Sequence, residues 1–223
     1  MKYLIIIILL IVSSVFYLIM DNKRLESAYS FSNGLTLKDS TVYLILRGSD
    51  TKLGGYAKQY NSTNPYASHL GIMIVDKGDQ NVFHVNTNQN EKGSHLISES
   101  LSSFTKSSQE DYPYISFWEI KGLNPIAISR LQKYIKELDT ASIKFDYQFN
   151  FENNEEMYCS EFVYKTLFSI DSLRFSVPKT RKKVLKSHQF FLKKDTLDYY
   201  PVDYFYDIED IELIGEWKDQ SSK

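Results

Sequence analysis

The 223-residue sequence contains a single cysteine, Cys159, and this scarcity limits the chemistry open to the chain. One thiol excludes an intramolecular disulfide and any metal site that needs several thiolates. The four histidines are His69, His84, His95 and His188, and their spacing matches neither the HxH nor the HxxxH pattern of zinc ligands. The sequence therefore predicts no metal ion and no other cofactor.

The chain also lacks an excess of charge of either sign. It has 26 Lys and Arg against 28 Asp and Glu, which gives a formal net charge of −2. Nucleic-acid binding needs a strong basic surplus, so the sequence predicts no nucleic-acid partner. No internal repeat and no second-domain boundary is visible, so we expect one domain over residues 39–217 and a polar tail over residues 218–223.

One long apolar run stands at the N-terminus, where residues 4–20 carry no charge. A bilayer-spanning helix needs about 17 residues or more, and no A-x-A cleavage site follows the run. We expect residues 1–22 to form a transmembrane anchor or a signal segment, joined to the domain by a linker over residues 23–38. Either reading locates the domain at the cell envelope, outside the cytoplasm. It would be membrane-anchored there, or secreted if the segment is cleaved.

Apolar patterning predicts the regular elements of the domain. Strands are expected over residues 41–46, 68–75, 81–85, 114–120 and 211–217, and a helix over residues 125–138 after the capping residue Asn124. The polar residues 86–112 predict a loop around the site. Residues 178–186 carry five basic side chains, which favours a solvated helix face or a contact with an anionic polymer or lipid head groups.

Cys159 stands at or just before the start of a further predicted helix. Phe162, Val163, Leu167 and Ile170 follow at spacings that put them on one helical face. Unpaired N–H groups and the helix dipole favour a thiolate at such a position, and thiolates are nucleophiles. A lone cysteine is also often a small buried apolar residue, so position alone leaves both interpretations open.

Two histidines fall on a predicted hairpin, because His69 begins the strand over residues 68–75 and His84 lies in the strand over residues 81–85. Side chains alternate between the two faces of a strand. An even number of residues in the connecting loop would put both histidines on the same face, diagonally opposed, and an odd number would separate them.

Three segments now combine: Leu44-Ile45-Leu46-Arg47-Gly48, Ser68-His69-Leu70-Gly71-Ile72 and Tyr158-Cys159-Ser160-Glu161-Phe162-Val163. In this order they resemble the YiiX/YebB-like group of NlpC-type cysteine hydrolases. The segments 145–149 and 200–203 are similar to that group as well, and the resemblance spans about residues 38–215. It implies an α+β, circularly permuted papain-like fold, in which an antiparallel sheet packs on the cysteine-bearing helix.

The resemblance also implies roles for individual residues. Cys159 matches the nucleophile, His69 the general base and His84 the third, orienting residue. Many members of the group have a glutamate at that third position, so His84 is a departure. We further expect Tyr158, Ser68 and Arg47 to bind substrate or to form part of the oxyanion hole.

These roles imply a thiol hydrolase that cleaves an amide or ester bond through an acyl-enzyme on a Cys-His-His triad. The envelope location favours a peptidoglycan-peptide amidase or endopeptidase. Two alternatives stay open: a lipid or fatty-amide hydrolase or acyltransferase of the same fold, and an inactive envelope binding protein. The expected partners are a cell-wall peptide or lipid-amide substrate and, through the N-terminal helix, the membrane; the oligomeric state is left undetermined.

Overall fold

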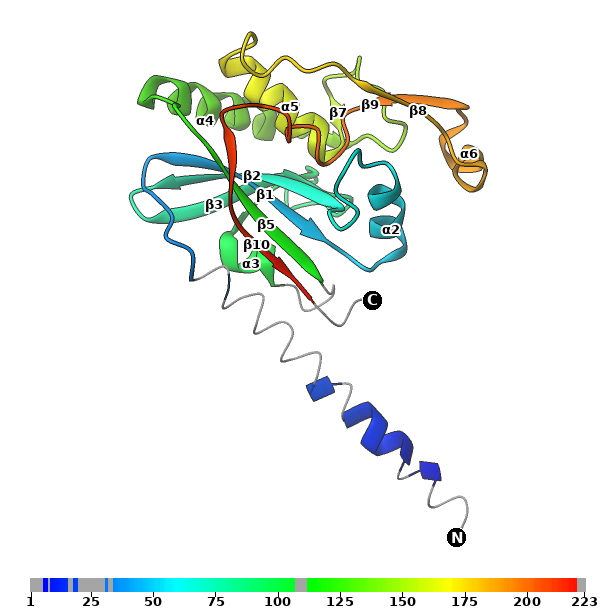
Figure 1. Ribbon diagram of the computed structural model, residues 1–223. Helices are drawn as coiled ribbons and strands as arrows, with labels where there is room; N and C mark the ends of the chain where they lie inside the picture. Colours follow the sequence, from blue (N-terminus) through cyan, green and yellow to red (C-terminus); the bar gives the residue numbers. More distant parts are fainter. Residues whose placement is uncertain are drawn as a thin grey trace.

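An antiparallel sheet of six strands, in the order β10-β5-β1-β2-β3-β4, runs through the centre of this computed structural model (Figure 1). Residues 6, 7, 9–15, 18, 19, 31, 34–106 and 112–219 are described. The strands are β1 (Thr41–Gly48), β2 (His69–Asp76), β3 (Asp79–Val85), β4 (Leu96–Ser100), β5 (Tyr114–Ile120) and β10 (Ile211–Lys218). Their β-branched and aromatic residues suit a pleated surface that is buried on both faces.

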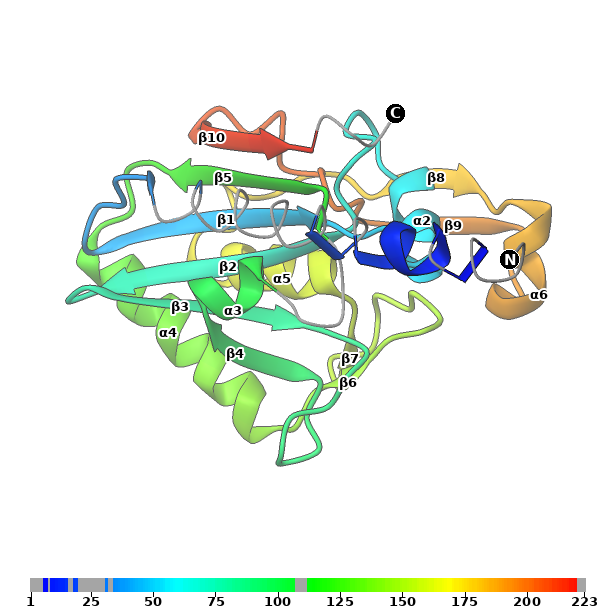
Figure 2. The ribbon, with the colours of Figure 1, turned by 90° about the horizontal axis from the view of Figure 1, so that it is seen from below.

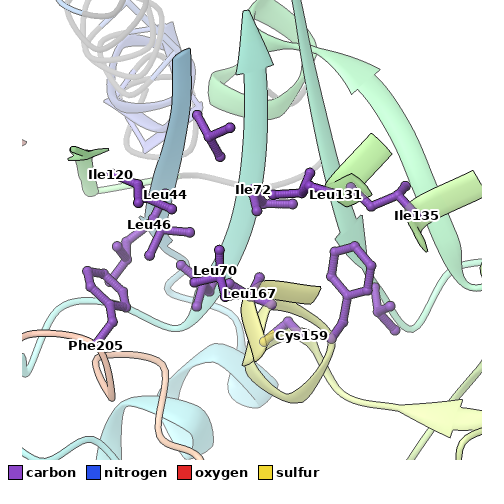
Figure 3. Packing of buried hydrophobic residues seen from close by; sticks show 14 of the residues in the cluster. Leu44, Leu46, Leu70, Ile72, Ile120, Leu131, Ile135, Cys159, Leu167 and Phe205 are labelled. Carbon is purple, nitrogen blue, oxygen red and sulfur yellow. The ribbon is translucent and has the colours of Figure 1, made fainter. Parts of the chain in front are cut away.

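Helices cover both faces of this sheet. On one face, α4 (Pro125–Thr140) and α5 (Cys159–Ile170) pack over alternate strand residues such as Leu44, Leu70 and Ile72 (Figure 3). On the other face, the short helix α3 (Leu101–Thr105) packs over the intervening residues, among them Ile45 and Met73. Figure 2 shows α3 lying across β2 and β3, with α4 and α5 behind the sheet. We call these the α5 face and the α3 face.

The remaining elements gather at one end of the sheet, as Figure 1 shows. They are α2 (Lys52–Gln59), the parallel pair β6 (Lys144–Phe145) and β7 (Glu156–Met157), and the hairpin of β8 (Thr180–Lys183) and β9 (Thr196–Tyr199), whose connection holds α6 (Lys186–Leu192). This end also receives the start of β2 and the first turn of α5. It is therefore where segments distant in sequence meet.

Most predicted elements are confirmed, and the α+β class with an antiparallel sheet on the cysteine helix is observed. Two predictions are wrong. Residues 86–112 are not simply a loop, because they contain β4 and α3, and β4 is stabilised by pairing with β3. Residues 178–186 do not form a helix face, because Thr180–Lys183 pairs with β9 as a strand that alternates between half-buried and exposed residues.

The predicted N-terminal anchor or signal segment and the linker over residues 23–38 lie largely outside the described residues. Those described between residues 6 and 19 are helical and exposed. No helix built from the described residues reaches the length and hydrophobicity that a membrane span requires. The N-terminal anchor stays a prediction.

Candidate active site

Cys159 is the first residue of α5, as the sequence predicts, and the turn around it is fixed on both sides. The Tyr200 N–H donates to the hydroxyl of Tyr158 at 2.9 Å, and the Ser160 hydroxyl donates to the Tyr200 carbonyl at 2.7 Å. The two neighbours of Cys159 are thus bound to the backbone of one residue. This arrangement fixes the direction in which the thiol points.

The protonation state of Cys159 differs from the sequence-based expectation. Burial raises the pKa of the thiol, although the backbone N–H groups of Leu70 and Ser160 and the charge of Arg47 act in the opposite direction. The helix N-terminus alone would favour a thiolate, but only 9% of the residue is exposed, and desolvation penalises the charged form more. At neutral pH the resting residue is therefore a thiol, and the expectation of a lowered pKa is wrong.

His69 and His84 lie on the same face of the hairpin, because β2 and β3 are joined by a turn of two residues, Lys77 and Gly78. Both turn residues have positive φ, at 52° and 87°, as tight hairpin turns require. The even loop length confirms the condition stated from the sequence. His69 Nε2 lies 2.8 Å from His84 Nδ1, which is a direct hydrogen bond.

A carboxylate that the sequence analysis missed continues this chain of contacts. Glu99 on β4 accepts a hydrogen bond from His84, with 2.8 Å between Oε1 and Nε2, and Arg47 Nη1 lies 3.8 Å from the same oxygen. A carboxylate is thus present one contact beyond His84, the residue that the resemblance put at the third position. Only Leu96 and Ile97 are apolar in Leu96–Ser100, so the residue types do not alternate and no period-two pattern indicated β4 or Glu99.

Phe104 of α3 covers this polar chain. The Arg47 guanidinium lies 4.3 Å from the centre of the Phe104 ring, and the His84 ring centre lies 5.1 Å from it. Arg47 also donates to the Phe104 carbonyl at 2.9 Å. Phe104 is fully buried, so it excludes water from the α3 side of the network.

Burial and charge keep both histidines neutral. Burial lowers the pKa of His69 well below its usual value, and the charge of Arg47 lowers it further. Burial also lowers the pKa of His84, although its hydrogen bond to Glu99 acts in the opposite direction. Burial would raise the pKa of Glu99, but the contacts with His84 and Arg47 outweigh it and lower that pKa. Glu99 is therefore an ionised acceptor at neutral pH.

Because Glu99 is ionised and both histidines are neutral, the hydrogen bonds determine which ring nitrogen of each histidine carries the proton. An ionised Glu99 only accepts hydrogen bonds, so His84 carries its proton on Nε2 and leaves Nδ1 as an acceptor. His69 must then donate through Nε2, which leaves the lone pair on its Nδ1. Nδ1 of His69 has no hydrogen-bond partner within the described part of the chain. It is thus set up to take a proton.

Cys159 and His69 both line one cavity of about 500 Å³. Within the described residues they share no direct hydrogen bond, so the structure brings them to the same space without joining them. His84 and Glu99 do not line the cavity and lie behind His69. Its walls are mainly aromatic and aliphatic, including Tyr56, Tyr60, Phe145, Phe149, Leu192, Leu197, Tyr199 and Val202.

Tyr158, Ser68 and Arg47 also line the cavity, and each already has a hydrogen-bond partner within the protein. The Ser68 hydroxyl accepts from the Ser49 N–H at 2.9 Å, and Arg47 is held on the α3 face. The Tyr158 hydroxyl accepts from Tyr200, so its own hydrogen stays available for donation. Contact of these three residues with a substrate stays a prediction.

Asp203 lies in the segment 200–203 that carries part of the family resemblance, and it positions the loop before β2. Its carboxylate accepts from the backbone N–H groups of Ser62, Thr63 and Asn64 at 2.7–3.0 Å. These residues belong to the loop that leads into His69. Asp203 therefore fixes the approach of the chain to the start of β2.

No protein-family model and no curated protein matches this sequence. One solved structure is similar in fold, described as metalloprotein yiiX from Escherichia coli O157:H7, DUF1105. It matches with a TM-score of 0.54 and 14% sequence identity, over 80% of this chain and 98% of that chain. The chain thus has a YiiX-like fold, as the resemblance implied.

The residues of this chain do not form a metal site within the part that the structure describes. No group of three or more His, Cys, Asp or Glu side chains there could hold a metal ion. Both nitrogens of His84 are occupied by hydrogen bonds to His69 and Glu99. The description of the similar structure as a metalloprotein therefore does not transfer to these residues.

Proposed function

We propose that this protein is a cysteine hydrolase that forms an acyl-enzyme on Cys159 and acts on an amide or ester of an acyl chain. The observation that carries the proposal is that Cys159 and His69 face one cavity while His84 and Glu99 hold His69 from behind. A thiol that shares a cavity with a neutral imidazole whose lone pair is free suits general-base activation of the nucleophile.

In the first half of the reaction, Nδ1 of His69 accepts the thiol proton as the sulfur attacks the carbonyl carbon. The backbone N–H of Cys159 has no partner within its helix and donates to the oxyanion of the tetrahedral intermediate. His69 then returns the proton to the leaving nitrogen or oxygen. The bond to the leaving group breaks, and a thioester with Cys159 forms.

In the second half, water attacks the thioester and gives a proton to His69. The carbon–sulfur bond breaks, the carboxylic acid leaves, and the proton returns to the sulfur. An alcohol or amine that replaced water would receive the acyl group instead. Hydrolysis and acyl transfer therefore need the same residues.

The walls of the cavity favour an acyl chain over a cell-wall peptide. Arg47 is the only Lys, Arg, Asp or Glu side chain among the described residues that line it, and its charge is already balanced by Glu99. A charged peptide would lose hydration in such a cavity without gaining ionic partners. A hydrocarbon chain would instead gain from contact with the aromatic walls.

The test uses the full-length protein in detergent micelles with 4-nitrophenyl esters and 4-nitroanilides of increasing acyl chain length. We expect intact mass spectrometry to detect the acyl group on Cys159 and kcat/KM to rise with chain length. The Cys159→Ala protein is the control and should show neither. Cleavage of a muramyl peptide alone would refute the acyl-chain assignment, and absence of any Cys159 adduct would favour a binding protein.

A further inference from the structure

Helix α6 lies at one extremity of the folded domain, where the β8–β9 hairpin carries it (Figure 1). Two of its aromatic side chains are exposed to solvent. Phe190 is 83% exposed and Phe191 61%, and their rings meet edge to face with 5.5 Å between centres. Leu185, just before the helix, is also exposed. Such large apolar groups rarely stand together on a surface that contacts only water.

The opposite side of α6 is anchored, so the two rings are held outward. His188 is buried, its Nδ1 lies 2.9 Å from the Tyr60 hydroxyl, and its ring centre lies 4.2 Å from that of Tyr56. A seven-residue helix has little stability of its own, and these contacts with α2 and the residue that follows it fix its orientation. Exposure of Phe190 and Phe191 is therefore a property of the packed structure.

Basic residues flank these rings in the sequence. Residues 179–195 contain seven Lys and Arg and a single acid, Asp195. Four of the basic groups have partners: Arg181 binds Asp198, Lys182 and Lys194 bind backbone carbonyls, and Lys179 lies over Phe151. The other three, Lys183, Lys186 and Lys193, are exposed and have no partner within the described residues.

The same surface surrounds the opening of the cavity. Leu53, Tyr147 and Phe191 line the cavity, yet they are 57%, 57% and 61% exposed, so they lie at its mouth. They come from three separate segments of the chain. Phe191 therefore joins the exposed aromatic pair of α6 to the entrance of the cavity that holds Cys159, and Lys186 and Lys193 stand at the two ends of the same short helix.

We infer that α6 and the cavity mouth form a docking surface for a lipid bilayer with anionic head groups. Aromatic rings flanked by lysines are the pattern of segments that lie in a membrane interface, with the rings in the acyl boundary and the ammonium groups at the phosphates. A soluble polyanion would satisfy the lysines but would leave both phenyl rings in water. This surface goes beyond the proposed chemistry, because binding does not require catalysis.

The test follows single sites in the full-length protein, reconstituted in nanodiscs. In a Cys159→Ser background, Phe190→Cys carries an environment-sensitive fluorophore, and Ile126→Cys on the distant α4 is the matched control, since Ile126 is 65% exposed. In discs with anionic lipid we expect the label at residue 190 to shift to shorter wavelength and to be quenched by lipid-bound quenchers. The label at residue 126 should not respond.

Charge should control this contact. Replacing Lys183, Lys186 and Lys193 with Glu should lower the fraction of inserted label by on the order of tenfold or more, and high salt should weaken it in the parent. A label at residue 190 that stays in water in anionic discs would refute the inference, as would equal responses at residues 190 and 126. A response to soluble polyphosphate in place of discs would identify a polymer partner and refute the membrane assignment.

An activity measurement separates docking from catalysis and depends on the proposed function. Phe190 does not line the cavity among the described residues, so Phe190→Asp should leave turnover of a short-chain soluble ester unchanged. Turnover of an acyl amide embedded in anionic discs should fall several-fold. Unchanged turnover of the embedded substrate would argue against a docking role, and equal loss of both activities would contradict the separation of docking from catalysis.

Discussion

Two glutamates on opposite faces of the central sheet have pKa values shifted in opposite directions. On the α3 face, contacts with His84 and Arg47 lower the pKa of Glu99 and keep it ionised. On the α5 face, burial raises the pKa of Glu161 to about 7, although Lys165 lies 2.8 Å away and opposes the shift. Both residues are glutamates near the site, so the surroundings alone decide their charge.

The two faces of the sheet supply different parts of the candidate site. The α5 face supplies the nucleophile on a helix packed among apolar residues, and Figure 3 shows Cys159 with other members of that cluster. The α3 face supplies a connected polar chain from Glu99 to His69. The two meet only at the start of β2, where His69 reaches the cavity.

The largest effect should come from the α5 face. Cys159→Ala removes the only thiol, so we expect at least about a 10³-fold loss of kcat for ester cleavage, because no covalent intermediate can form. Steady-state kinetics with a 4-nitrophenyl ester measure this loss. Full activity in the Cys159→Ala protein would contradict the proposed mechanism.

Removal of the base should be nearly as damaging. His69→Gln keeps a polar side chain but cannot take the thiol proton at neutral pH, so we expect roughly a 10²–10⁴-fold loss of kcat. The modification rate of Cys159 by iodoacetamide should fall with it. An unchanged alkylation rate would mean that His69 and Cys159 are not coupled.

His84 and Glu99, which lie behind His69, should affect kcat less than Cys159 and His69 do, and the more distant Glu99 should affect it least. His84→Ala should cost more than Glu99→Gln, because glutamine can still accept from His84 but carries no charge. We expect losses of about tenfold to a hundredfold for the first, by analogy with other residues that orient a functional histidine through a hydrogen bond. Equal activity in His84→Ala and the parent would restrict the candidate site to Cys159 and His69.

The charge of Arg47 should set the acid limb of the pH–rate profile. Activity needs neutral His69, whose pKa is lowered by burial and by Arg47, so the limb should lie below pH 6.5 in the parent. Arg47→Met removes the positive charge and should shift the limb to higher pH. A limb that does not move would show that Arg47 has no influence on the base.

The last prediction concerns the free energy of unfolding and involves Glu161 on the α5 face. The folded pKa of Glu161, about 7, exceeds its unfolded value, so the folded state binds more protons and stability falls as pH rises from about 4.5 to about 7. Glu161→Gln should remove up to roughly 3 kcal/mol of this fall. Urea unfolding of both proteins at pH 5 and pH 8 gives the difference, and identical pH dependences would contradict it.

Much of the site was predictable from local signals. The apolar spacing after Cys159 predicts α5, and the turn between β2 and β3 relates His69 to His84 once its length is known. Glu99 and Phe104 were missed because short polar segments have no distinctive period. They acquire structure only by pairing with β3 and packing on its residues.

The sequence by itself determined the main strands and helices and the position of Cys159 at a helix start, because these depend on periodicity; for the two histidines it stated only the condition on turn length that the structure then met. Only the tertiary structure decided the charges of these groups and the apolar lining of the cavity. It also decided that α6 holds Phe190 and Phe191 outward. Burial, contacts between distant strands and the anchoring of a short helix all arise from packing, which no local pattern contains.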